Sequence, residues 1–188
     1  SASDDQGLFG YLGASASIAR LGVTGSIITT GQHAGGVAAC ARNGAAISEC
    51  FSAADVIAAK WAGGICGFAQ SYKVTITNCY NTGAVTASGA DGFAGGINAC
   101  GTNSTLGASL TNCYNAGTVT GTARVGAIIG NPVSDRIYNC YYLDGSVIRN
   151  GNGDKVSISK TATEFADGTV LALLKTGERA NNADPWDT

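Results

Sequence analysis

The chain has 188 residues, of which 45% are hydrophobic and only 13% are charged, a length and composition typical of one globular domain. The net charge is −2, so the sequence lacks the basic surplus with which proteins bind nucleic acid or anionic membranes. We therefore expect no nucleic-acid partner. We also expect no membrane insertion, because no apolar run approaches the roughly 18 residues that a membrane-spanning helix requires.

In chain order, five segments share one pattern, in which an apolar residue stands three positions before a leucine or cysteine. The segments are SIARLG (17–22), AISECF (46–51), TITNCY (75–80), SLTNCY (109–114) and RIYNCY (136–141). Their successive spacings are 29, 29, 34 and 27 residues. Such a period is typical of repeat proteins, in which each unit buries its apolar face only by stacking on its neighbours.

Two further landmarks recur in the same frame. An apolar residue follows the leucine or cysteine six positions later, at Ile27, Val56, Val85 and Val119. A glycine-rich element comes next, at GLFGY (7–11), GVAAC (36–40), GICGF (64–68), GINAC (96–100) and AIIGN (127–131). Short β segments divided by small turn residues predict an all-β parallel β-solenoid, similar to a β-helix, of about five coils of 27–34 residues. A sandwich built from repeats is the alternative, because the period does not determine the shape of the coil.

In stacked coils, aligned positions form columns with a spacing of about 4.8 Å. One structural column would contain Leu21, Cys50, Cys79, Cys113 and Cys140. The second would contain Ile18, Ile47, Ile76, Leu110 and Ile137. We expect both columns to point into a narrow core. Because the four cysteines align with Leu21 of the first repeat, the pattern favours buried free thiols over disulfides.

The residues on either side of the cysteines also form columns. Phe51, Tyr80, Tyr114 and Tyr141 follow them, and strand alternation places these rings on the outer face. Tyr80, Tyr114 and Tyr141 are therefore candidate binding residues that would stack sugar rings or contact a protein, although packing beneath insertions or a cap is the alternative. Asn78, Asn112 and Asn139 precede the cysteines and predict a structural ladder of amide hydrogen bonds.

We expect residues 1–147 to form the repeats and residues 148–188 to form a turn-rich segment with a C-terminal helical cap. Thr161 and Glu164 form a capping-box pattern, and apolar residues in 165–175 predict one or two short helices that cover the last coil. The other end begins inside a unit, and methionine is absent even at position 1. We therefore expect the chain to be part of a longer protein, with neighbouring domains.

The glycine-rich elements resemble the GLUG-motif repeat family. Its signature stands at Gly7-Leu8-Phe9-Gly10 and Gly64-Ile65-Cys66-Gly67, and its accompanying segment N-C-Y-N-x-G-x-V stands at 78–85 and 112–119. Alanine replaces the closing glycine in 36–39 and 96–99. The resemblance covers about residues 7–147. It implies a non-catalytic module of a secreted or cell-wall-attached bacterial surface protein, since family members include adhesins and some immunoglobulin-A-cleaving zinc peptidases.

The sequence predicts no catalytic residues, no metal site and no cofactor. The seven cysteines contain no CxxC pair, and no HExxH motif occurs. His33, the only histidine, is predicted to lie in a surface turn. Glu49, Asp55 and Asp91 form no pair in the repeat frame, and Lys60 and Lys73 are candidate bases only by residue type.

These observations favour a rigid stalk or adhesive module located outside the cell or on its surface, with a glycan or a host protein as partner. Two alternatives remain. The first is a carbohydrate-active β-helix enzyme, which would require two carboxylates at catalytic distance. The second is a self-assembling surface scaffold, in which the N-terminal end stacks on another chain.

Overall fold

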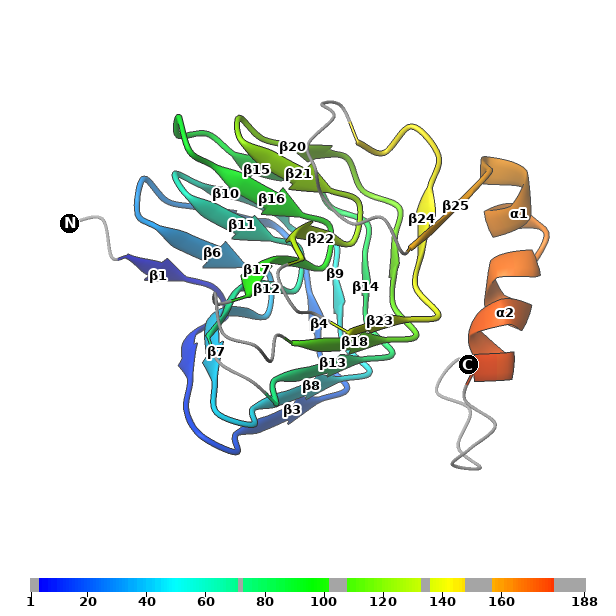
Figure 1. Cartoon of the computed structure of the whole chain (residues 1–188), viewed down its shortest axis with the longest axis horizontal. Coiled ribbons are helices and arrows are strands. Elements are labelled where there is room, and N and C mark those ends of the chain that lie inside the picture. Colours follow the sequence, from blue (N-terminus) through cyan, green and yellow to red (C-terminus); the bar gives the residue numbers. More distant parts are fainter. Residues whose placement is uncertain (1–3, 71–72, 102–107, 133–135, 148–156, 178–188) are drawn as a thin grey trace.

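The computed structural model describes residues 4–70, 73–101, 108–132, 136–147 and 157–177. The chain forms a parallel β-solenoid followed by two short helices, which confirms the predicted fold class (Figure 1). Three of the sheets contain one strand from each of five passes of the chain, in agreement with the expected count of about five coils. Residues 102–107, which include most of the polar insertion in the longest repeat, lie outside the described residues.

Five parallel sheets, which we name A to E in the order in which each coil enters them, form the solenoid. Sheet A contains β1 (Asp5–Gln6), β6 (His33–Gly35), β11 (Trp61–Gly63), β16 (Phe93–Gly95) and β21 (Arg124–Gly126). Sheet B contains β2 (Phe9–Leu12), β7 (Ala38–Arg42), β12 (Cys66–Gln70), β17 (Asn98–Gly101) and β22 (Ile129–Asn131). Sheet C contains β3 (Ser17–Ala19), β8 (Ala46–Ser48), β13 (Thr75–Thr77), β18 (Ser109–Thr111) and β23 (Arg136–Tyr138).

The remaining two sheets complete each coil. Sheet D contains β4 (Gly22–Val23), β9 (Phe51–Ser52), β14 (Tyr80–Asn81), β19 (Tyr114–Asn115), β24 (Tyr141–Leu143) and β25 (Ile158–Lys160). Sheet E contains β5 (Ser26–Ile28), β10 (Asp55–Ala58), β15 (Val85–Ala87) and β20 (Val119–Thr120). In Figure 1 sheet C runs along the bottom and sheet E along the top.

The register of the strands follows the repeat frame. In sheet C the second structural column is paired residue by residue, from Ile18 through Ile47, Ile76 and Leu110 to Ile137. In sheet D, Gly22 pairs with Phe51, so Leu21 lies next to Cys50, and the column continues through Cys79 and Cys113 to Cys140. All seven cysteines are buried, and none of them forms a disulfide.

The apolar core has two parts that a row of glycines and polar side chains separates. One part lies among sheets B, C and D around Ile47 and Ile76, and the other lies between sheets E and A around Val56 and Val85. At the boundary, a Cβ added to Gly64 would lie 2.5 Å from Asn81 Cγ, so only glycine fits there. Asn81 is fully buried, and its Nδ2 donates to Asn115 Oδ1 over 2.9 Å. We call this row the waist.

The residue before each member of the column of Leu21 and the four cysteines has a left-handed backbone. The φ angles are 55° at Arg20, 52° at Glu49, 55° at Asn78, 52° at Asn112 and 51° at Asn139. Asparagine tolerates this conformation better than most residues, which explains its recurrence in the last three coils. In this column Asn139 Nδ2 also donates to Asn112 Oδ1 over 2.6 Å, a contact of the kind that the amide-ladder hypothesis predicts.

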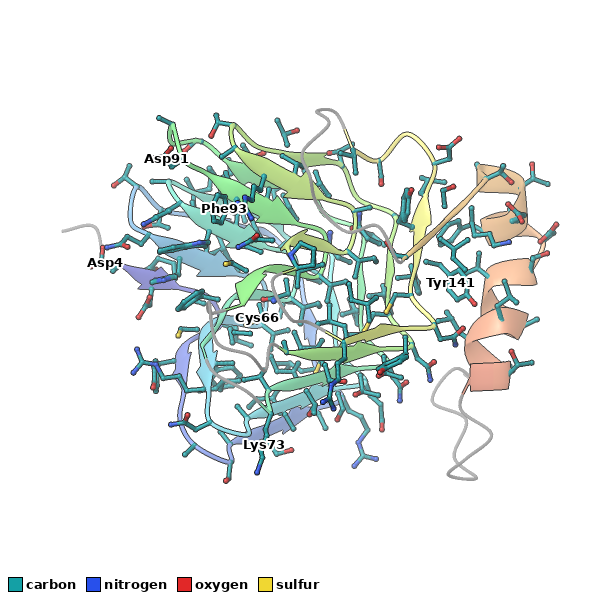
Figure 2. The ribbon with its side chains drawn as sticks, in the orientation of Figure 1. Asp4, Cys66, Lys73, Asp91, Phe93 and Tyr141 are labelled. Carbon is teal, nitrogen blue, oxygen red and sulfur yellow. The ribbon has the colours of Figure 1, made fainter. Side chains whose placement is uncertain are left out.

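The C-terminal residues cover one side of the last coil. Helix α1 (Ala162–Ala166) begins with the predicted capping box between Thr161 and Glu164, and α2 (Thr169–Gly177) follows after Asp167. Val170 and Leu174 of α2 pack on Tyr141. Helix α2 lies at the right of Figure 1, and Tyr141 is labelled beside it in Figure 2. Residues 148–156 and 178–188 lie outside the described residues, so the domain division at residue 147 stays a prediction.

Candidate binding surfaces

The ring column predicted from the sequence is a continuous stack on sheet D. Phe51 and Tyr80 have ring centroids 5.1 Å apart with an interplanar angle of 9°, and Tyr80 and Tyr114 have centroids 4.8 Å apart with an angle of 1°. Stacking at this distance uses the ring faces for contacts between coils. The row therefore presents ring edges and hydroxyl groups outward, which is a different surface from the open ring faces that stacking on a sugar requires.

The cap covers the C-terminal end of this row. Tyr141 is 5% exposed beneath Val170 and Leu174, and its hydroxyl donates to Asn139 Oδ1 over 2.6 Å. Tyr114 contacts Phe165 at a centroid distance of 5.6 Å, and burial raises the pKa of its hydroxyl above the ordinary value of 10. Tyr114 and the cap line a small open pocket together with Leu171. Of the three candidate tyrosines, Tyr80 lies farthest from the cap.

A second aromatic row, which the sequence analysis missed, lies on sheet A. The prediction of a turn at His33 was wrong, because His33 begins strand β6 and pairs in register with Trp61, then Phe93 and then Arg124. The His33 and Trp61 rings stack with centroids 4.7 Å apart. His33 Nδ1 lies 2.6 Å from Asp5 Oδ1 at the N-terminal end of the row. Each ring residue stands three positions before a glycine of the motif, in H-A-G-G, W-A-G-G and F-A-G-G, and this spacing was the available signal.

A row on sheet B faces this one. Phe68 contacts both His33 and Trp61, each with ring centroids 5.1 Å apart, and Arg124 Nη1 donates to Asn131 Oδ1. In register with Phe68 and Asn131 stand Tyr11, Cys40 and Cys100. We name the two rows the inner-corner cluster; it consists of Asp5, His33, Trp61, Phe93 and Arg124 on sheet A and Tyr11, Cys40, Phe68, Cys100 and Asn131 on sheet B. Phe93 and the side chains around it are drawn in Figure 2.

Three cations lie over rings of this cluster. Lys60 Nζ is 4.0 Å from the centroid of the Trp61 ring, and Arg42 Cζ is 5.0 Å from that of Tyr11. Arg124 Cζ is 5.6 Å from the centroid of the Phe93 ring. Within the part of the chain that the structure describes, none of the three forms an ion pair with a carboxylate. Aromatic faces hold a cation without neutralising its charge, so the cluster keeps a local positive surplus.

Two hydrogen-bond donors of this corner have unmet bonding capacity. Trp61 Nε1 and Arg42 Nε are buried and have no hydrogen-bond partner among the described residues. Buried donors are paired in the great majority of cases, by protein or by ordered water. Both donors lack solvent-exposed surface, so their missing hydrogen bonds lower the stability of this corner.

The titratable groups of the cluster limit its chemistry. Burial, and then the charge of Asp5, raises the pKa of the Cys40 thiol to about 11, so this residue is a neutral thiol near pH 7. Elsewhere, Glu49 lies 3.9 Å from Arg20, and Asp55 Oδ1 accepts a hydrogen bond from Ala84 N over 3.0 Å. No group of three or more His, Cys, Asp or Glu in the described ranges could hold a metal ion. In the same ranges, neither helix has the length and apolar character needed to cross a bilayer.

Comparison with known proteins yields one solved structure of similar fold. No family model matches the chain, and no curated protein matches it. The crystal structure of a "putative immunoglobulin A1 protease" from Bacteroides ovatus matches with a TM-score of 0.75 and 25% sequence identity. The match covers 98% of this chain but only 65% of that one. The neighbour's description agrees with the link to immunoglobulin-A-cleaving proteins that the sequence resemblance implies.

Proposed function

We propose that this chain is a non-catalytic segment of a larger bacterial surface or secreted protein, in which it acts as a rigid stalk and binding module. The observation that carries the proposal is the side-chain register: coils paired strand by strand hold rows of rings and cations at fixed spacing. The structural neighbour supports an extracellular setting, and this chain spans 65% of that protein's length.

The stalk and the binding roles have a common physical basis. Each internal strand is hydrogen-bonded to the coil before it and to the coil after it. The solenoid therefore bends only if the hydrogen bonds of several sheets are distorted together. A rigid support holds exposed side chains in a fixed arrangement and lowers the entropy cost of binding an extended partner. Glycans and host proteins are the partners that this arrangement fits.

The test is binding of the purified chain to arrays of glycans, mucins and host matrix proteins. The variant Tyr80→Phe/Tyr114→Phe removes the two hydroxyls and keeps the stacked rings, whereas Lys60→Gln/Arg124→Gln changes the inner-corner cluster. Binding that one folded variant loses and the other retains supports a binding module and identifies its surface. Absence of binding to every array would overturn the binding role and leave the stalk role alone.

A further inference from the structure

The inner-corner cluster combines charge and aromatic surface in a way that no other described surface does. Lys60 and Arg124 lie over successive rings of one row, Trp61 and Phe93, and the single carboxylate of the cluster, Asp5, is engaged with His33. The rings of Trp61, Phe68 and Phe93 are half-buried there. Partial burial lowers the screening by water and so strengthens the attraction between these cations and an anion that contacts them.

The cations are spaced along the solenoid axis. Lys60 Nζ lies over the Trp61 ring and Arg124 Cζ lies over the Phe93 ring, and Trp61 pairs directly with Phe93. The rings that hold the two charges are therefore one strand spacing, about 5 Å, apart along the axis. A ligand that satisfies both must therefore be extended, must lie along the axis and must carry repeated negative charge.

The backbone of this corner disfavours a peptide as the occupant. Strand β11 is paired with β6 and β16, and β12 is paired with β7 and β17, so neither offers a free edge for an added strand. Recognition must therefore use side chains, namely the edges of the half-buried rings and the cations of Lys60 and Arg124. A chain of sugar rings, with hydroxyl groups and apolar patches, matches such a surface better than a peptide does.

We propose that the inner-corner cluster binds an acidic polysaccharide, which lies along the solenoid axis with its carboxylate groups near Lys60 and Arg124. This inference rests on the proposed binding function and adds the ligand class and the site. It assigns the tyrosine row on sheet D to packing between coils and beneath the cap.

The probe is polygalacturonate, a polymer of uronic acid, with its carboxyl-reduced form as the matched neutral ligand. We expect the folded chain to bind polygalacturonate, to bind the reduced polymer at least about tenfold more weakly, and to lose affinity as salt is raised. The variant Lys60→Gln/Arg124→Gln should lower the affinity about tenfold. Arg136→Gln, which removes an exposed cation on sheet C, should change it less than about twofold.

Each other outcome overturns the inference. Equal binding of the acidic and reduced polymers would show that charge is not recognised, and an unchanged affinity in the double variant would place the site elsewhere. Binding of poly-glutamate as tightly as polygalacturonate, with the same loss in the double variant, would make an acidic peptide the occupant. Absence of polygalacturonate binding, together with binding to another ligand on the arrays, would refute this inference and leave the proposed function standing.

Discussion

At the scale of single residues, the cysteine column shows how a small polarisable side chain packs in a narrow core and also forms hydrogen bonds there. The Cys79 side chain is fully buried, and its Sγ donates to Thr77 O over 3.2 Å and to Ile47 O over 3.7 Å. Burial raises the pKa of the Cys79 thiol, whereas its hydrogen bond to Cys50 lowers the pKa of the Cys50 thiol to about 7. A thiol therefore serves both as an apolar filler and as a weak donor to the neighbouring coil.

Replacing Cys79 with aspartate should destabilise the protein by several kcal/mol, because the carboxylate would be buried without a partner. Thermal or urea unfolding of Cys79→Asp measures the effect. Thr82→Asp is the control, since Thr82 is exposed in the same coil. A melting temperature equal to that of the wild type would contradict the position of Cys79 in the core.

Asn98 is a position at which we expect a substitution to stabilise the protein. It is fully buried between the aligned residues Cys66 and Ile129, and neither atom of its side-chain amide has a partner among the described residues. An unpaired buried amide costs about 1–3 kcal/mol, so Asn98→Val should raise the free energy of unfolding by about 1–2 kcal/mol.

Asn115→Val is the matched control for that variant. Asn115 is equally buried, but it accepts from Asn81 Nδ2 and donates to Gly117 O over 2.8 Å. We expect its replacement to lower the free energy of unfolding by about 1–3 kcal/mol, because Asn81 Nδ2 would lose one of its two acceptors and Gly117 O would lose the Asn115 donor. Urea denaturation distinguishes the two, and a loss of stability in Asn98→Val would show that this amide is hydrogen-bonded in solution.

The sequence predicted the register of the apolar columns well, but it predicted the rows of polar and aromatic residues only in part. Ile47 and Ile76 recur at one spacing with one side-chain type, so their pairing could be inferred directly. The residues at the aligned position of sheet A differ as His33, Trp61, Phe93 and Arg124, and only the glycine two positions after each of them is constant. The contact of Asn81 could not be inferred from the sequence, because its partner, Asn115, is 34 residues away and belongs to another coil.

At the scale of the element, helix α1 depends on a small set of contacts at its first turn. Lys160 Nζ lies 2.8 Å from Glu164 Oε1, and Thr161 N donates to Glu164 Oε2 over 2.8 Å. The hydrogen bond from Lys160, followed by those from Thr161, lowers the pKa of the Glu164 carboxyl from 4.5 to about 2. The folded helix therefore binds the ionised carboxylate in preference to the neutral acid.

This shift predicts a pH dependence of the cap. Because the pKa is lower in the folded state, the stabilisation is fully present above about pH 4.5 and is lost as the pH falls towards 2. The difference in stability between wild type and Glu164→Gln should shrink over that range. Hydrogen exchange of the α1 amides measures it, with Asp91→Asn, at an exposed position, as the control. A difference independent of pH between 2 and 5 would contradict the capping role of the carboxylate.

At the scale of the whole molecule, the two ends of the solenoid differ. Helices α1 and α2 pack on Tyr141 at one side of the last coil, whereas no helix packs on the described residues of the first coil, where Ile28 is 66% exposed and Leu8 is 53% exposed. The internal coils contain the fully buried residues Ile47, Ile76 and Leu110. Stability in a stacked array depends on contacts with both neighbours, so a coil with one neighbour is less stable.

We therefore expect amide hydrogen exchange to be fastest in the first coil, slower in the last coil and slowest in the second to fourth. Mass spectrometry of peptides that cover β2–β5 and β12–β15 measures the comparison directly. Uniform protection along the stack would indicate a single cooperative unit. Slowest exchange in the first coil would contradict the argument, and a contact that shields that end would have to be sought.

The waist of glycine and asparagine has a consequence for how such a molecule changes in size. Three coils each contribute one glycine and one polar side chain to that row, namely Gly36 with Ser52, Gly64 with Asn81 and Gly96 with Asn115, so inserting part of a coil would misalign both halves of the core at once. A duplicated whole coil would preserve every contact and add about 4.8 Å to the axis. The length of the solenoid can thus change only by whole coils. Each added coil also lengthens any row of side chains that runs along the axis.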